Sequence, residues 1–105
     1  MFITVLEVMM KVASFMKFQV QEEKIDDFVA ELQPIVESFL ERPGVISLTM
    51  AKTGDYEVMS CCVYDSMLSL KSNADALKES IAIVLPMISK EEGSVERYLG
   101  DVVAS

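Results

Sequence analysis

The sequence of 105 residues contains no histidine and no tryptophan. Without histidine, the chain cannot form Ser-His-Asp or Cys-His catalytic pairs, a His-ligated haem or the usual zinc sites. Its four glycines are scattered along the chain, so no glycine-rich loop is present to hold a phosphate group. The sequence therefore lacks the residues of histidine-dependent catalytic, zinc and haem sites and of a glycine-rich phosphate loop.

Cysteine is also scarce, and the two that occur, Cys61 and Cys62, are neighbours in the chain. Adjacent residues of a strand point to opposite faces, so these two thiols cannot readily bridge each other. A nucleophilic cysteine usually needs a base such as histidine to form the thiolate, and none is available. We therefore interpret both as small, reduced, buried side chains.

Positive charge is low as well: 9 Lys and Arg residues face 17 Asp and Glu residues, for a net charge of −8. An acidic chain without a basic cluster is repelled by phosphate backbones, so nucleic-acid binding is not expected. The apolar run Phe2–Met10 contains Glu7 and is much shorter than the roughly 20 residues that cross a membrane. It also lacks a basic start and a cleavage pattern, which leads us to expect a cytoplasmic protein without membrane contact.

The length and composition are those of one globular domain spanning residues 1–105, with residues 1–10 as a possible N-terminal extension. Three interpretations of that extension stay open: an extra strand, an arm exchanged between subunits, or a mis-assigned start ahead of Met9 or Met10.

The first half of the remaining chain reads as a strand, a helix and a second strand. Residues Lys11–Val20 alternate in the manner of a strand, after which apolar residues from Ile25 to Leu40 recur at helical spacing. Pro34 is expected to bend or interrupt that helix. Arg42, Pro43 and Gly44 end it, and a second strand follows over Val45–Lys52.

The second half repeats the pattern. A hairpin turn at Thr53, Gly54 and Asp55 leads into a strand over Asp55–Ser66, whose last residues, Asp65 and Ser66, offer a helix cap. The helix that follows carries an apolar stripe, loosened in its middle by Ser72 and Asn73, with Asn73 expected to be solvated. A last strand covers Val95–Val103. The stripe comprises Leu70, Ala74, Leu77, Ile81, Val84, Leu85 and Ile88.

The order strand-helix-strand-strand-helix-strand predicts an α+β, ferredoxin-like βαββαβ domain with a four-stranded antiparallel sheet and both helices on one face. The strand that begins at Asp55 is apolar on both of its faces, so the face without helices also needs a cover. Burying one large apolar side chain contributes roughly 1.5–3 kcal/mol. We therefore expect a homodimer whose sheets pack face to face.

Two short motifs carry a resemblance to a known family. The Pro43-Gly44-Val45 step into the second strand and the Val63–Ser66 exit from the third strand are similar to those of the antibiotic biosynthesis monooxygenase-like domains, within the dimeric α/β-barrel superfamily. The resemblance covers Lys11 to Val103. It implies a dimeric barrel and a pocket between the sheet and the two helices.

The resemblance further implies a protein that binds an apolar or aromatic small molecule. One alternative is a cofactor-independent monooxygenase acting on a quinol- or anthrone-like substrate, which supplies its own electrons. The other is a non-catalytic ligand-binding or dimerisation module of the same fold. The haem-degrading members of the family need a histidine that this sequence lacks, so no cofactor is expected.

Three residues are candidates for catalysis. Tyr64 and Tyr98 could hydrogen-bond a substrate oxygen, or they could simply pack as buried tyrosines do. Asp65 could act as a general base if it is buried, although its position suits a helix cap.

Six residues are candidates for ligand binding. Serines in apolar strands can supply the few polar groups of a pocket, or act as small spacers, and Arg97 could hold an anion or pair with Glu96 at a strand edge. The candidates are Ser14, Met16, Phe18, Ser60, Tyr64 and Arg97.

Overall fold

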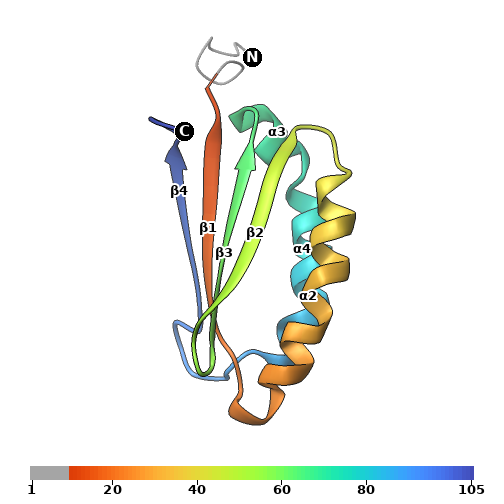
Figure 1. The fold of residues 1–105 in the computed structure, drawn as a ribbon, viewed down its shortest axis with the longest axis vertical. Coiled ribbons are helices and arrows are strands. Elements are labelled where there is room, and N and C mark those ends of the chain that lie inside the picture. The colour runs from red at the N-terminus through yellow and green to blue at the C-terminus, as the bar shows by residue number, and fades with distance from the viewer. Residues whose placement is uncertain (1–9) are drawn as a thin grey trace.

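The structure, a computed structural model, describes residues 10–105; the expected extension over residues 1–10 lies outside the described part except for Met10. Its four strands are β1 (Val12–Gln19), β2 (Val45–Gly54), β3 (Glu57–Tyr64) and β4 (Val95–Asp101). All neighbouring strands are antiparallel, and the sheet order is β2-β3-β1-β4, as Figure 1 shows. The ferredoxin-like α+β fold is thereby confirmed.

The helices all lie on one side of this sheet (Figure 1). A short turn, η1 (Glu22–Lys24), leads into α2 (Ile25–Leu40). After β3 come α3 (Met67–Ser72), α4 (Ala74–Val84) and the turn η2 (Leu85–Met87). Within residues 10–105 no helix is long and apolar enough to cross a membrane.

Several boundaries differ from those that the sequence predicts; the last strand, for example, ends at Asp101 rather than at Val103. β2 continues to Gly54, so the hairpin turn consists of Asp55 and Tyr56 rather than beginning at Thr53. The second helix breaks at Asn73 and its regular part ends at Val84. Leu85, expected on the apolar stripe, falls in the following turn and is 56% exposed.

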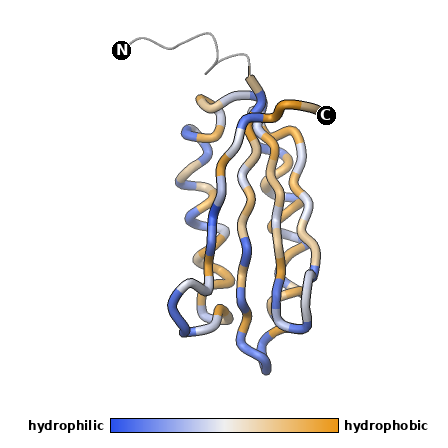
Figure 2. Tube along the Cα trace, turned by 90° about the vertical axis from the view of Figure 1, so that its left-hand side faces the viewer, coloured by the Kyte–Doolittle hydropathy of each residue, from blue (hydrophilic) through white to orange (hydrophobic). Residues whose placement is uncertain are grey.

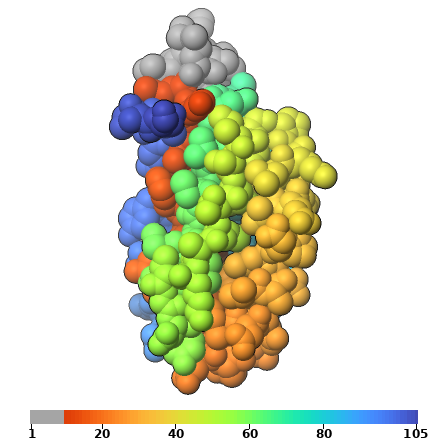
Figure 3. All heavy atoms as spheres, viewed as in Figure 1, coloured from red at the N-terminus to blue at the C-terminus, as the bar shows by residue number. Residues whose placement is uncertain are grey.

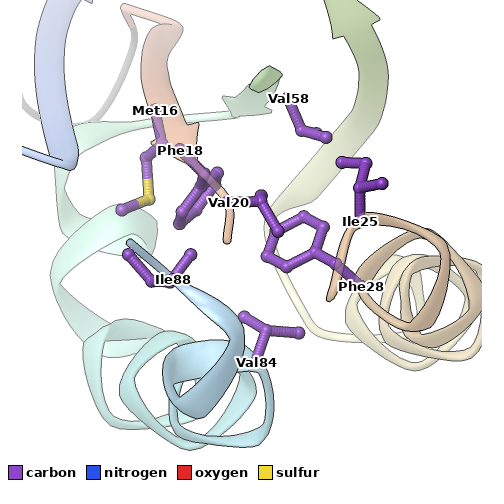
Figure 4. Packing of buried hydrophobic residues seen from close by; sticks show 8 residues of the cluster. All are labelled: Met16, Phe18, Val20, Ile25, Phe28, Val58, Val84 and Ile88. Carbon is purple, nitrogen blue, oxygen red and sulfur yellow. The ribbon is translucent and has the colours of Figure 1, made fainter. Parts of the chain in front are cut away.

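Alternation along the strands decides which side chains meet the helices. In β1, Val12, Ser14, Met16 and Phe18 face inward and are buried. In β3 the inward set is Val58, Ser60, Cys62 and Tyr64. Val12, Cys62 and Tyr64 from these rows join Phe39 and Leu70 in a second core cluster. Met16, Phe18 and Val58 pack against α2 and α4 in the main core cluster, which Figure 4 shows from close by. The eight residues of that cluster are Met16, Phe18, Val20, Ile25, Phe28, Val58, Val84 and Ile88.

Pro34 lies inside the continuous helix α2, so of the two outcomes expected from the sequence, a bend or an interruption, the interruption does not occur. Proline removes one backbone N–H from the helix, leaving the carbonyl four residues earlier, that of Ala30, without its partner. Both Pro34 and Ala30 are exposed, so water can hydrogen-bond that carbonyl. Phe28 and Phe39, on either side of the proline, are both buried, so tertiary packing stabilises the helix on both sides of Pro34.

Asn73 is buried and not solvated, which corrects a second expectation: only 2% of it is exposed. Its Oδ1 accepts a hydrogen bond from Arg42 Nε at 2.6 Å, and its Nδ2 donates to the carbonyl of Pro43 at 3.0 Å. Nδ2 also donates to the carbonyl of Ser69 at 2.8 Å. The break between α3 and α4 therefore fastens the helical layer to the loop between α2 and β2.

Among residues 10–105, no helix covers the outer face of the sheet (Figure 1). One end of it is polar: Glu57 accepts a hydrogen bond from Gln19 at 2.8 Å and lies 3.4 Å from the Lys17 ammonium. The rest of this face is apolar and is made by Ala13, Phe15, Met59, Cys61, Val63 and Tyr98. Figure 2, which faces this side, shows hydrophilic colour at the hairpin end of the strands.

Candidate functional site

A narrow cavity lies between the sheet and the helical layer. Its sheet wall comes from β1, β2 and β3, and its other wall comes from α2 and α4. The sheet residues are Ser14, Met16, Phe18, Leu48, Met50, Ser60, Cys62 and Tyr64, and the helix residues are Phe28, Leu32, Ile35, Phe39, Leu77, Ser80, Ile81 and Val84. Five of the six predicted ligand-binding residues therefore line one cavity: Ser14, Met16, Phe18, Ser60 and Tyr64.

The polar groups of the sheet wall belong to the two central strands. Ser14, on β1, is 3% exposed, and its hydroxyl oxygen accepts a hydrogen bond from Arg97 Nε at 3.1 Å. Because Arg97 donates, the Ser14 hydroxyl keeps its own proton to give to another acceptor. Ser60, on β3, makes no side-chain hydrogen bond within the described residues. Its hydroxyl is therefore available to a molecule in the cavity.

Arg97 itself does not line the cavity. It lies on the exposed edge strand β4 and reaches the site only through the Ser14 hydroxyl. The expected pairing with Glu96 does not occur, because Glu96 points to the other face and accepts a hydrogen bond from Tyr98. The guanidinium nevertheless contributes positive potential, which acts to lower the pKa values of Tyr64 and Cys62.

Tyr64 is 1% exposed and packs edge-on against Phe39, with ring centroids 6.3 Å apart. Burial raises the pKa of Tyr64 far above its ordinary value of 10, with a smaller contribution from Cys62. Burial also raises the pKa of the Cys62 thiol, which hydrogen-bonds with Tyr64. Both groups therefore stay protonated near neutral pH, so Tyr64 can serve as a hydrogen-bond donor but not as a base.

The other two catalytic candidates lie away from the cavity. Asp65 is exposed and accepts hydrogen bonds from the hydroxyls of Ser66 and Ser69. Ser66, which follows it, caps α3 by accepting from the backbone N–H of Ser69 at 3.1 Å. Tyr98 is 59% exposed on the outer face of β4 and donates to Glu96 at 2.9 Å. Neither side chain lines the cavity that contains Tyr64.

Ser80 lines the cavity from α4, and inspection of the sequence missed it. A signal was present, since Ser80 lies three residues after Leu77 and four before Val84, both on the apolar stripe. A serine at that spacing faces the same side as its apolar neighbours. It adds a hydroxyl to the helical wall.

No Asp, Glu, Lys or Arg belongs to the cavity lining in the described part of the chain. Residues 10–105 also contain no cluster of His, Cys, Asp and Glu side chains able to hold a metal ion. The cavity is narrow: the centre of a water molecule can occupy only about 40 Å³ of it. Chemically, it offers apolar surface, a few hydroxyl donors and one thiol.

Comparisons with known proteins reveal similarity at the level of the fold. No family model and no curated protein matches the sequence, whereas many solved structures match the fold. A variant of SnoaB, a cofactor-independent oxygenase from Streptomyces nogalater, superposes with a TM-score of 0.75 at 12% identity, covering 90% of this chain and 95% of SnoaB.

Two further structures extend the comparison. A Caulobacter crescentus protein, provisionally named an antibiotic biosynthesis monooxygenase, has a TM-score of 0.76 at 20% identity, covering 94% of this chain and 95% of its own. A conserved Methanosarcina mazei protein has a TM-score of 0.75 at 19% identity, covering 90% of this chain and 94% of its own. The chain thus shares the fold on which antibiotic biosynthesis monooxygenase-like domains are built.

Proposed function

We propose that this chain binds an aromatic molecule with an ionisable oxygen in the cavity between sheet and helices, and that it oxygenates this molecule without a cofactor. The observation that carries the proposal is the set of protonated hydroxyls, Ser14, Ser60 and Tyr64, on an otherwise apolar wall. Apolar walls hold the rings, and the hydroxyls receive the oxygen. SnoaB, which has the same fold, is a cofactor-independent oxygenase. We place the activity in the cytoplasm.

The chemistry suits a quinol- or anthrone-like substrate. In an anthrone, the ring methylene loses two hydrogens and gains one oxygen atom of O₂ as a carbonyl, while the other oxygen atom leaves as water. The substrate gives up four electrons and O₂ accepts four, so no other reductant is needed. Because no carboxylate lines the described cavity, the substrate must ionise through its own acidity and release its proton to solvent water.

The protein would promote this loss by stabilising the enolate or phenolate. Donors held in a water-poor site stabilise developing negative charge more strongly than water does. Ser14 is oriented for that purpose by Arg97, which also places a positive charge behind it. The Tyr64 hydroxyl donates its hydrogen bond to the sulfur of Cys62, which is a weak acceptor, so a ligand oxygen is the better acceptor.

Oxygen uptake tests this proposal. Purified protein is mixed with anthrone or with a naphthohydroquinone in an oxygen electrode, and heat-denatured protein measures the spontaneous oxidation. We expect uptake above that background, with one O₂ consumed per anthrone, and slower uptake in Ser14→Ala. Uptake equal to the background with every substrate would rule out the oxygenase.

A second candidate, a non-catalytic ligand-binding module, is favoured by the small volume of the cavity. About 40 Å³ is well below the roughly 150 Å³ that accommodates benzene, so the core is close to filled. Binding of naphthol without any oxygen uptake on quinols or anthrones would select this module over the oxygenase.

We also propose that the chain forms a homodimer through the outer face of its sheet. Phe15, Met59 and Tyr98 are 40%, 37% and 59% exposed there, and they neighbour one another across β1, β3 and β4. A contiguous apolar patch of this kind is typical of an interface. A second copy offers the same patch and so is a self-complementary cover.

A further inference from the structure

A groove on the surface runs along the seam between α2 and β2. Its walls are Val29, Leu32, Gln33 and Val36 from the helix and Leu48, Thr49 and Met50 from the strand. Figure 3 shows the hollow between these two elements. The groove is larger than the cavity: the centre of a water molecule can occupy about 450 Å³ of it.

Three side chains form a shared partition between this groove and the cavity. Leu32, Leu48 and Met50 line both hollows, and each is only partly buried. The cavity alone is too small for an aromatic ring, whereas the groove is not. Moving the partition would join the two spaces.

The seam contains nothing polar that would resist such a movement. No hydrogen bond or ion pair joins α2 to β2 among residues 10–105. Gln33, at the rim, donates instead to Glu37 on its own helix at 3.2 Å. In the described part of the chain, β2 is also an edge strand, paired with β3 alone. Apolar contacts alone hold the seam closed, and these can part without leaving a buried polar group unpaired.

Met50 is the most adaptable member of the partition. Methionine is unbranched with three rotatable bonds, so it changes rotamer at low cost, whereas leucine is branched and stiffer. Met50 lies opposite Ser60 in the pairing of β2 with β3. A rotation of the Met50 side chain therefore opens a direct path from the groove to the free hydroxyl of Ser60.

We propose that the α2–β2 seam is the entrance to the cavity and that Met50, with Leu32 and Leu48, is its gate. The gate admits a flat apolar ring whose oxygen leads towards Ser60, and it excludes water when it is closed. This inference rests on the proposed binding function for its ligand, but the opening of the gate can be measured without one.

A cysteine placed behind the gate reports its opening. The variant Ser60→Cys is made in a background of Cys61→Ala and Cys62→Ala, and its thiol is labelled with dithiodipyridine, a neutral aromatic disulfide. Met50→Ala is then expected to speed labelling by about tenfold, equal to lowering the opening free energy by about 1.4 kcal/mol. Met50→Trp is expected to slow it by a similar factor.

Met67→Ala is the matched control. Met67 is also a partly buried methionine, but it packs against the second core cluster and lines neither hollow. A labelling rate that rises equally in Met50→Ala and Met67→Ala would report global unfolding and contradict the gate. A labelling rate that does not change in Met50→Ala would contradict it as well.

Naphthol binding, followed by fluorescence, separates this proposal from the proposed function. A true gate changes the association and dissociation rates together, whereas a simple wall residue changes dissociation alone. Labelling that follows Met50 without any naphthol binding would support the entrance and contradict the binding function. Naphthol binding together with a labelling rate that is independent of Met50 would support the binding function and contradict the entrance.

Discussion

At the scale of the residue, Tyr64 and Tyr98 show how position within a strand decides what a side chain can do. Tyr64 lies on the central strand β3 and Tyr98 on the edge strand β4. Tyr64 is 1% exposed, whereas Tyr98 is 59% exposed. Tyr64 faces the helices and the cavity, while Tyr98 faces the bare side of the sheet. Burial is the main cause of the raised pKa of Tyr64, whereas the hydrogen bond to Glu96 is the main cause of the raised pKa of Tyr98.

Replacing Tyr64 by phenylalanine removes the hydroxyl and keeps the ring on Phe39. We expect naphthol binding to weaken by about tenfold, the loss of one hydrogen bond worth about 1.4 kcal/mol, with little change in thermal stability. Tyr98→Phe is the matched control, because its hydroxyl bonds to Glu96 on the other face. Fluorescence titration measures both, and equal affinities in the two variants would contradict a role for Tyr64.

Glu57 makes stability depend on acidity. Hydrogen bonds from Thr53 at 2.7 Å and from Gln19 at 2.8 Å lower the pKa of Glu57 below its ordinary value of 4.5. Because the folded pKa lies below the unfolded one, this stabilisation is present above pH 4.5 and is lost as the pH falls through the folded value.

The variant Glu57→Gln should therefore lower the melting temperature near neutral pH, and its effect should shrink as the pH falls through the folded pKa, because the wild-type carboxyl then becomes protonated too. Thermal melts of both proteins across this range check the prediction. Glu31→Gln, on the exposed side of α2, is the control. A penalty from Glu57→Gln that stays constant with pH would show that the carboxylate is not the cause.

At the scale of the element, the junction at Asn73 holds the helical layer in place. It ends α3, begins α4 and ties both to the segment that leads from α2 into β2. Gly44 in that segment has φ +83° and lies so close to Ser69 that a Cβ would collide with its side chain. The close approach explains why glycine follows Pro43.

Asn73→Ala should be among the more damaging polar substitutions. It removes three hydrogen bonds and leaves the Pro43 carbonyl without its side-chain donor, so we expect a loss of about 2–3 kcal/mol in the free energy of unfolding. Ser72→Ala, at the exposed neighbouring position, should cost much less. Urea denaturation measures the free energy of unfolding of both variants. A similarly small loss in both would contradict the role of Asn73 in holding the junction.

The sequence predicted the order of the elements and which residues of β1 and β3 share a face, because alternation and helical spacing are local patterns, but it left open which face meets the helices. It did not predict the burial of Asn73, whose partners Arg42 and Pro43 lie about 30 residues away. It placed Ser14, Ser60 and Tyr64 correctly in apolar strands, but their meeting in one cavity depends on strand pairing. Tyr98 and Tyr64 look alike until the covered face is known.

At the scale of the whole molecule, the two sides of the sheet differ in what covers them. The inner side meets the helices, and the outer side is apolar over Phe15, Met59 and Tyr98 but polar around Lys17 and Glu57. The polar end limits how far a second sheet can cover this face, so the proposed dimer contact lies nearer the other end.

Phe15→Arg should disrupt that dimer, because it buries an unpaired charge in the centre of the patch. We expect a monomer by light scattering at micromolar concentration, where the wild type gives a dimer. Ile83→Arg is the matched control: Ile83 is also an exposed apolar residue, at 53%, but it lies on α4. A monomeric wild type would reject the dimer outright.

The division of the cavity between its two walls also bears on how such a protein can change over evolutionary time. The hydroxyls of Ser14, Ser60 and Tyr64 are fixed on the two central strands, which are held by hydrogen bonds on both edges. The residues that set the size and access of the space lie mostly on helices and on the edge strand β2. Substitutions there can adapt the protein to a differently shaped molecule while the groups that would recognise its oxygen stay where they are.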